Sequence, residues 1–396
     1  MAITHPTSYN SIFLFLATTF NFFFFFEYSN ATYINVINYG ANPNGQFDST
    51  IPFLRAWSLA CKSKEATTIY VPQGSFLLKQ VTFLGPCMNK IDFRIDGTLV
   101  APLDYWSLGN SGYWILFMKV NRISIYGGTL NGRGHSYWRC RRGGKICPVK
   151  SRSISFSWSN NVVVNGLTSL NSQTVHIAID HCNNVVIQDV KIRAPSGSPN
   201  TDGINVQFSN GVTISHSTIM TGDDCISINQ GCTNLWIEQI ACGPGHGISI
   251  GSLGTNVNEI GVQNVTVTDS VFTKTENGVR IKSWAQPSNG YARNIVFRNI
   301  IMHNVYNPII IDQRYCPGRQ CPHQSSGVKI SRVSYEHIRG TSASPIAINL
   351  DCSQSNPCLG IKFEDINLTY LKGSAKSSCT NAAGNNIGVV IPRSCL

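Results

Sequence analysis

The sequence predicts an all-β protein, folded as a single right-handed parallel β-helix with capped ends. Two observations predict this fold: a strand-like segment recurs at a nearly constant interval, and the composition favours strands and turns. Charged residues make up only 13% of the 396 residues, which is low for a helical protein. Val, Ile, Thr, Asn, Ser and Gly recur throughout, and hydrophobic residues, at 42%, suffice for a large core.

The recurring segment is six residues long, and its alternate apolar residues are expected to point into a core. Copies begin at Ile123, Val162, Val185, Val212, Leu235, Ile260, Ile295, Val333 and Ile361. From Val162 to Ile260 the intervals are 23, 27, 23 and 25 residues, without a helical pattern between copies. This period is typical of a solenoid, whose Asn-rich turns at 160–161 and 183–184 are expected to form amide ladders. A leucine-rich repeat lacks its leucine pattern here, and a propeller repeats at about twice this interval.

The ends of the repeat are expected to be capped, because a terminal coil would otherwise expose its core and its strand edge. Residues up to about 120 show the repeat poorly, and a helix over 49–62 is predicted there as part of a cap. The segment from Gly373 is expected to cap the other end. Residues 133–152 form a loop insertion rich in Gly, Arg and Cys. The interpretation is one domain over 32–396.

Residues 1–31 resemble a secretory signal peptide. An apolar run from Ile12 to Phe26 is too short for a comfortable membrane span and is followed by Ser29-Asn30-Ala31, so cleavage is expected near Ala31. An N-terminal helix that stays as an anchor is the alternative. Secretion to the cell wall or apoplast is expected, with no membrane association after cleavage.

Fourteen cysteines, an even number, fit disulfide bonds in an oxidising compartment. Some lie close in sequence: Cys140 with Cys147, Cys316 with Cys321, and Cys352 with Cys358. Cys379 and Cys395, in the C-terminal segment, are also expected to form disulfides. No CxxC pair suggests zinc. Asn264 and Asn367 each begin a glycan acceptor sequon.

Four polar residues stand out by their spacing. Asp202, Asp224 and His246 follow one another at intervals of 22 residues, and Asp223 precedes Asp224. Equivalent positions on neighbouring coils lie about 4.8 Å apart, so these side chains are expected to meet, with Gly222 bending the chain. Three carboxylates this close raise the pKa of at least one of them. A protonated acid beside an ionised base is what glycoside hydrolysis requires, whereas a calcium site is the alternative.

Two cations follow on a later coil. Arg280 and Lys282 lie on one face of a strand, where they are expected to bind the carboxylate of a substrate. The formal charge of +11 likewise indicates an acidic partner. Acidic polysaccharide, nucleic acid and an anionic membrane are the candidates, and polysaccharide fits the cluster best.

Four motifs, in this order, resemble the signatures of the polygalacturonases, the pectin-cleaving glycoside hydrolases of family 28. They are Asn200-Thr201-Asp202-Gly203, Gly222-Asp223-Asp224, Gly245-His246-Gly247 and Arg280-Ile281-Lys282. The run from Cys242 to Gly254 looks like the plant members. The resemblance covers most of residues 34–396 and implies an inverting hydrolase of α-1,4-galacturonan with a right-handed β-helix.

The resemblance also implies roles for the catalytic residues. Asp224 resembles the general acid, Asp202 and Asp223 resemble the residues that activate water, and His246 resembles the histidine that supports protonation of the acid. Cys225 and Cys242 resemble a family disulfide that flanks the site.

For substrate binding, the resemblance implies Asn200, Arg280, Lys282 and Tyr315. No cofactor, no metal and no nucleic acid are expected, and the protein is expected to be a monomer.

Other functions stay open at this stage. A rhamnogalacturonan or xylogalacturonan hydrolase would use the same scaffold. An inactive pectin-binding wall protein is a non-enzymatic alternative, against which the intact motifs argue. A pectate lyase would need calcium and an arginine base. The sequence does not decide between cleavage within the polymer and cleavage at its end; the former is slightly favoured, and the basic insertion at 133–152 is the segment expected to matter.

Overall fold

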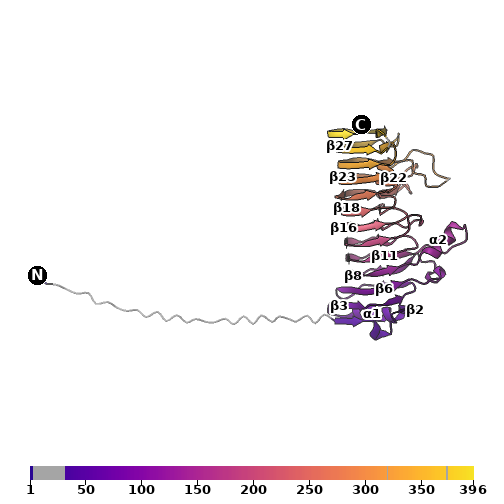
Figure 1. The fold of residues 1–396 in the computed structure, drawn as a ribbon. Coiled ribbons are helices and arrows are strands. Elements are labelled where there is room, and N and C mark those ends of the chain that lie inside the picture. Colours follow the sequence, from indigo (N-terminus) through magenta and orange to yellow (C-terminus); the bar gives the residue numbers. More distant parts are fainter. Residues whose placement is uncertain (3–31, 319, 372) are drawn as a thin grey trace. The chain divides into compact units, whose positions relative to one another are not determined.

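A computed structural model describes residues 1–2, 32–318, 320–371 and 373–396. The predicted signal peptide therefore lies almost wholly outside the described residues. Residues 31–396 form one compact unit. Its strands stack in chain order, each pairing in parallel with strands of the neighbouring coils, as Figure 1 shows. This is the predicted right-handed parallel β-helix.

Within the described residues the first sheet has 18 strands. They are β1 (Thr32–Asn35), β2 (Asn44–Asp48), β3 (Thr67–Val71), β4 (Ser75–Leu77), β6 (Ile91–Val100), β8 (Asn121–Asn131), β10 (Asn160–Asn165), β11 (Thr168–Leu170), β13 (Asn183–Gln188), β14 (Lys191–Arg193), β16 (Asn210–Met220), β18 (Thr233–Cys242), β20 (Val262–Thr268), β21 (Val271–Thr273), β23 (Tyr291–Val305), β25 (Lys329–Ser342), β27 (Cys358–Tyr370) and β29 (Ala382–Ile391).

The second sheet has 11 strands among the described residues, and it carries the polar cluster. They are β5 (Val81–Leu84), β7 (Tyr113–Met118), β9 (Arg152–Ser157), β12 (Ile177–Asp180), β15 (Ile204–Gln207), β17 (Ile226–Ile228), β19 (Ile248–Leu253), β22 (Asn277–Ser283), β24 (Asn307–Asp312), β26 (Ile346–Asp351) and β28 (Lys376–Thr380).

The repeat falls in the first sheet, and the register confirms all but one of the predicted copies. Val162, Val185, Val212 and Leu235 are successive partners and are buried. The next partner of Leu235 is Val265, so the copy placed at Ile260 was misaligned. Ile260 is 57% exposed and precedes the strand.

The predicted amide ladder is present and longer than expected. Asn183 Nδ2 donates to Asn160 Oδ1 at 3.0 Å, and Asn184 donates to Asn161 at 3.3 Å. Further along the stack, Asn264 donates to the side chain of Asn234 at 3.1 Å. Because each amide both donates and accepts, the ladder fixes the coil register at the surface.

The N-terminal region differs from the prediction. The helix α1 (Thr50–Lys62) forms as expected and buries Phe53, Ala56, Trp57 and Ala60, the spacing of one helix face. Yet the residues after it are not a cap, because β3 pairs with β6 and β6 with β8. Short strands and a register shift between Ile95 and Thr98 obscure the period there. The helix α1 and the 3₁₀-helix η1 (Val36–Tyr39) stand apart from these paired strands.

The other two predicted irregular segments also contain regular structure. The insertion at 133–152 holds the helix α2 (His135–Arg142), and a short 3₁₀-helix, η2 (Tyr105–Leu108), precedes it in the chain. The C-terminal segment does cover its end of the core, but as a last coil, since β28 pairs with β26 and β29 with β27.

Six disulfides form, including all three pairs that the sequence suggested by proximity. The pairs are Cys61–Cys87, Cys140–Cys147, Cys225–Cys242, Cys316–Cys321, Cys352–Cys358 and Cys379–Cys395. Cys182 and Cys232 are buried free thiols, so the even count does not mean full pairing. Among the described residues, no helix combines the length and apolarity needed to cross a bilayer.

Candidate active site

The predicted cluster assembles where successive strands of the second sheet begin. Asp202 lies just before β15, Asp223 and Asp224 just before β17, and His246 just before β19. Parallel pairing of these strands brings the three turns into one row. The turns need glycine at their tightest points: a Cβ on Gly222 would overlap the carbonyl of Ser198.

Asp224 is the most buried carboxylate of the cluster, with 2% of its surface exposed. Arg280 Nη2 and Lys282 Nζ each contact one of its oxygens at 2.8 Å. Ser249 Oγ also donates to Asp224 at 2.8 Å and accepts from Arg280 Nε at 2.9 Å. Asp224 is therefore bound by two cations and a hydroxyl donor, which are charge-assisted contacts.

Asp223 belongs to a different network. Its Oδ1 lies 3.1 Å from Nδ1 of His246, and its Oδ2 accepts from Asn200 Nδ2 at 3.3 Å. His246 Nε2 in turn lies 3.3 Å from Glu276 Oε2. The imidazole therefore lies between two carboxylates, of which Asp223 is the more buried.

These contacts set the proton affinities of the pair. The hydrogen bond to Asp223 raises the pKa of His246 against the opposing effect of burial, and the negative charges of Asp223, Glu276 and Asp224 add to it. Burial acts to raise the pKa of Asp223, but the hydrogen bond and charge of His246, with the charge of Lys282, lower it overall. Asp223 and His246 thus share protons as a unit.

Asp202 stands beside Asp224 on the floor of the site. Its Oδ2 accepts a 2.7 Å hydrogen bond from Ser227, which is the strand partner of Ser249. Burial, followed by the negative charges of Asp223 and Asp224, raises the pKa of Asp202 to about 7. Below pH 7 the carboxyl group of Asp202 is therefore mostly protonated, beside Asp224 and its two cationic partners.

The resemblance implied that Asp224 is the general acid and that His246 supports it. In the structure His246 contacts Asp223, whereas Asp224 contacts Arg280 and Lys282. A carboxylate paired with two cations is a poor proton donor, because losing its charge would leave both cations unpaired. The sequence could not show which of two adjacent aspartates faces which partner.

Tyr315 completes the cationic side of the site, as expected. Its ring centre lies 5.0 Å from Lys282 Nζ and 5.9 Å from the guanidinium carbon of Arg280. Trp284 packs against the same ring edge-on at 5.4 Å. An aromatic face above two cations leaves a surface that suits a sugar ring bearing a carboxylate.

Sequence reasoning missed Ser227, Ser249 and Glu276. The two serines were detectable, because they lie 22 residues apart like the cluster residues that they support. Glu276, three residues after the end of β21, follows no such spacing and only its contact with His246 reveals it.

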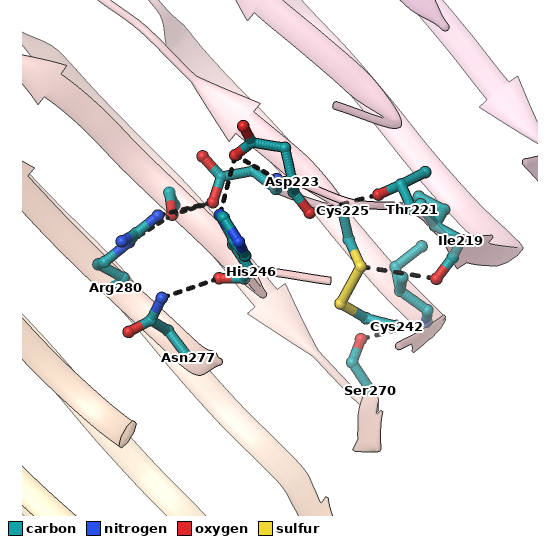
Figure 2. Close-up of a disulfide and its surroundings, with 12 residues drawn as sticks. Ile219, Thr221, Asp223, Cys225, Cys242, His246, Ser270, Asn277 and Arg280 are labelled. Carbon is teal, nitrogen blue, oxygen red and sulfur yellow. Dashed lines mark hydrogen bonds and ion pairs between the residues drawn. A yellow bond between two sulfur atoms is a disulfide. The ribbon is translucent and has the colours of Figure 1, made fainter. Parts of the chain in front are cut away.

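Figure 2 shows the disulfide Cys225–Cys242 next to the turn that carries Asp223. Cys225 directly follows Asp224, and its partner lies at the end of β18. The carbonyl of Asp223 also accepts from the backbone of His246 at 2.8 Å. These bonds tie the acidic turn to the neighbouring coil, so that its carboxylates are held in place before substrate arrives.

A groove leads away from the cluster along the outer face of the second sheet. It has a volume of about 550 Å³. Asn200 and Asp202 line one end, and Tyr113, Lys150 and Arg152 line the other. Its floor crosses β15, β12, β9 and β7, three strand spacings or about 14 Å. The groove is therefore long enough for more than one sugar ring.

The cluster is a poor metal site. Oxygen and nitrogen atoms of Asp223, Asp224 and His246 lie within 4.8 Å of one another. However, both oxygens of Asp224 already contact cations, and a metal ion would be repelled by Arg280 and Lys282. The donor set is that of an acid–base site.

Comparison with known proteins agrees with this geometry. The profile of glycosyl hydrolases family 28 matches residues 61–391. The chain belongs to this family. It is 55% identical over 365 residues to a polygalacturonase of Prunus persica, covering 91% of this chain and 93% of that protein. It is 40% identical to an exopolygalacturonase of Platanus acerifolia, covering 92% and 98%.

Among solved structures, the endo-xylogalacturonan hydrolase of Aspergillus tubingensis superposes with a TM-score of 0.79 at 21% identity, covering 91% of this chain and all of that one. At this identity the likeness concerns the fold. The superposition confirms that this chain has the β-helix of the xylogalacturonan hydrolase.

Proposed function

We propose that this family 28 protein is a polygalacturonase, which hydrolyses α-1,4 linkages between unesterified galacturonic acid units of pectin with inversion. The observation that carries the proposal is that His246 contacts Asp223 whereas two cations contact Asp224. The cluster of aspartates lies at one end of a groove that Lys150 and Arg152 line. Relatives that span nearly the whole chain and are named polygalacturonases support the choice of substrate.

Asp223 is the general acid in this proposal. His246 contacts it directly and is partly exposed, so the imidazole can supply a proton from solvent after each turnover. Substrate binding excludes water and adds a negative uronate, both of which favour the protonated form of Asp223. The acid protonates the glycosidic oxygen as the bond to the anomeric carbon breaks.

Asp224 is the base, and Asp202 positions the water with it. The cations of β22 contact both oxygens of Asp224, and the raised pKa of Asp202 lets its carboxyl group remain protonated and donate a hydrogen bond that orients the water. Water that attacks from this floor reaches the face of the sugar opposite the leaving group, which inverts the anomeric centre. Asp224 accepts the proton that the water loses as its oxygen bonds to the anomeric carbon.

Arg280 and Lys282 have donors beyond those that contact Asp224, since a guanidinium has five and an ammonium three. With Tyr315 above them, these donors bind the carboxylate of a galacturonate unit next to the scissile bond. The same cations therefore position the base and select an acidic sugar.

Leaving-group dependence tests the assignment of the acid. Asp223→Asn, Asp224→Asn and Asp202→Asn are each expected to lose about 10³-fold or more in kcat on polygalacturonate. On a dinitrophenyl galacturonide, whose leaving group needs no proton, only Asp223→Asn should regain activity. Regained activity in Asp224→Asn instead, with the fold confirmed by circular dichroism, would restore the acid role to Asp224.

Cleavage within the polymer is the mode that the groove supports. It continues past Asp202 for several coils rather than ending after one sugar unit. Early products on polygalacturonate should therefore be mixed oligomers, with a rapid fall in viscosity. Release of monomer or dimer alone would indicate cleavage at the chain end.

Secretion to the cell wall, a monomeric state and glycans on Asn264 and Asn367 belong to the same proposal. Both asparagines are exposed on the first sheet, on the side of the coil away from the catalytic strands. Mass spectrometry of the secreted protein tests the leader cleavage and both glycans together.

A further inference from the structure

One part of the chain carries most of the excess positive charge. Between residues 105 and 179 the sequence holds nine lysines and arginines but no aspartate or glutamate. The whole chain has a formal charge of +11. About a fifth of the chain thus accounts for most of the excess, and this part includes the walls of the groove.

Within it, residues 139–150 form a segment that we call the basic loop. It comprises the end of α2 and the turn closed by a disulfide, and α2 stands out from the stacked strands in Figure 1. Five of its cations are exposed: Arg139, Arg141, Arg142, Lys145 and Lys150. Among the described residues none of these five forms an ion pair. Their charge is therefore available to an external anion.

The basic loop is held in shape. Cys140 and Cys147 are joined, and Tyr137 Oη donates to the carbonyl of Pro148 at 3.2 Å. The side chains of Tyr137, Trp138 and Cys140 are buried, although Arg139 and residues 141–146 around them are exposed. A preformed cationic surface loses little backbone entropy when it binds, which favours a structural role in recognition over a mere solubility effect.

The loop also lies at the rim of the groove. Lys150, its last residue, lines the groove together with Val149. Trp138, in α2, donates from its buried Nε1 to the carbonyl of Gln173 at 3.1 Å, and the next residue, Thr174, lines the groove wall. A polymer that leaves the groove at the end opposite Asp202 therefore meets the basic loop.

We propose that the basic loop is a second binding surface for the substrate polymer, which holds an unesterified stretch of galacturonan beyond the groove. The choice of this polyanion rests on the proposed function. Two linked binding regions on one polymer raise its effective concentration at the catalytic site, and a charged surface also speeds encounter. The loop would thus make the enzyme prefer long chains with blocks of free carboxylates.

A charge-removal variant tests this surface. Arg141→Ala/Arg142→Ala/Lys145→Ala leaves α2, the disulfide and the groove residues intact. In low salt we expect kcat/KM on polygalacturonate to fall about tenfold, mainly through KM, because three weak contacts are lost from a tethered site. On oligogalacturonides short enough to stay within the groove, the variant and the wild type should agree. The difference on polymer should shrink at about 0.3 M salt, where exposed charges are screened.

The matched control removes three exposed, unpaired cations from the first sheet. Lys191→Ala/Arg193→Ala/Lys329→Ala changes the net charge equally, at residues that belong neither to the basic loop nor to the lining of the groove. If both triple variants lose the same activity on polymer, general charge rather than the basic loop is responsible and the proposal is wrong. Equal losses on short and long substrates would also overturn it.

Binding to immobilised polymer separates this proposal from the proposed function. With Asp224→Asn added to prevent turnover, weaker retention of the basic-loop variant than of the control on polygalacturonate is the expected result. Retention that is unchanged, or that falls equally on dextran sulfate, would refute a galacturonan surface. If no galacturonan is hydrolysed by the wild type, the proposed function fails, while the retention still decides whether the basic loop binds the polymer.

Discussion

Replacing Glu276 with glutamine tests whether a protonated His246 is part of the active form. Glu276 lies 3.3 Å from His246 Nε2, and the substitution keeps its shape while removing its charge. The groups that face His246 are then Asp223 and Asp224, with Lys282 acting on Asp223. Because Glu276 contributes to the raised pKa of His246, its neutralisation must lower that pKa.

The size of the shift follows from exposure. The side chains of His246 and Glu276 are 36% and 54% exposed, so their ion pair is worth about 0.2–1 kcal/mol. One pKa unit corresponds to about 1.4 kcal/mol, which gives a shift of about 0.15–0.7 units. The protonated form of His246 would then be lost at lower pH. The alkaline limb of kcat/KM should move to lower pH by this amount, with the acidic limb and the maximal rate nearly unchanged.

The assay is the initial release of reducing ends at subsaturating polygalacturonate across the pH range, at constant ionic strength. Glu65→Gln is the control, since Glu65 is exposed and precedes β3 at the N-terminal end of the coil. It removes the same charge without touching the site, and its profile should match the wild type. An alkaline limb that stays in place or moves to higher pH in Glu276→Gln would refute the role of the protonated imidazole.

Two further predictions concern the floor of the site. Asp202 has a folded-state pKa of about 7, above the ordinary value of 3.8 for an aspartate, so its ionisation costs stability as pH rises between these values. Asp202→Asn should therefore raise Tm by about 1–4 °C at pH 7.5 but leave it unchanged at pH 4 in a thermal scan; equal changes at both pH values would contradict this. Lys282→Met removes one of the two cations that contact buried Asp224. The loss of transition-state stabilisation should be about 2–5 kcal/mol, which lowers kcat/KM about 30-fold or more. A loss below threefold, with normal circular dichroism, would show that Arg280 alone suffices.

The fold was predictable because its signal is local and repeated. The alternation of apolar residues in the copies from Val162 through Leu235 is visible in the sequence, and the same residues are strand partners in the structure. The prediction was wrong where an apolar run such as that at Ile260 lies next to the true strand, since hydrophobicity does not record which residue pairs with Leu235. It also missed the coils before β8, whose short strands break the period.

The sequence predicted which residues lie together in the candidate site, but not which contacts they make with one another. Spacing along the chain identifies residues that share a row, such as Asp202, Asp224 and His246. It does not record how the turn at Gly222 directs two adjacent side chains, one toward His246 and the other toward β22. That choice is set by contacts across coils, and the proposed roles of the two carboxylates rest on it.

The register between paired strands, rather than the distance along the chain, therefore determines which side chains meet in the site. The intervals from Asp202 to Asp224 and from Asp224 to His246 are equal, but a longer loop separates His246 from Arg280. The loop does not disturb the site, because Ser249 still pairs with Arg280 across β19 and β22. The hydroxyl group of Ser249 accepts a hydrogen bond from Arg280 and donates one to Asp224. Lengthening a loop between coils should leave the cluster intact, whereas a one-residue slip within β22 would turn both cations into the core and leave Asp224 unpaired. The different contacts of Asp223 and Asp224 thus depend on strand pairing in the second sheet, which the fold fixes before any substrate is bound.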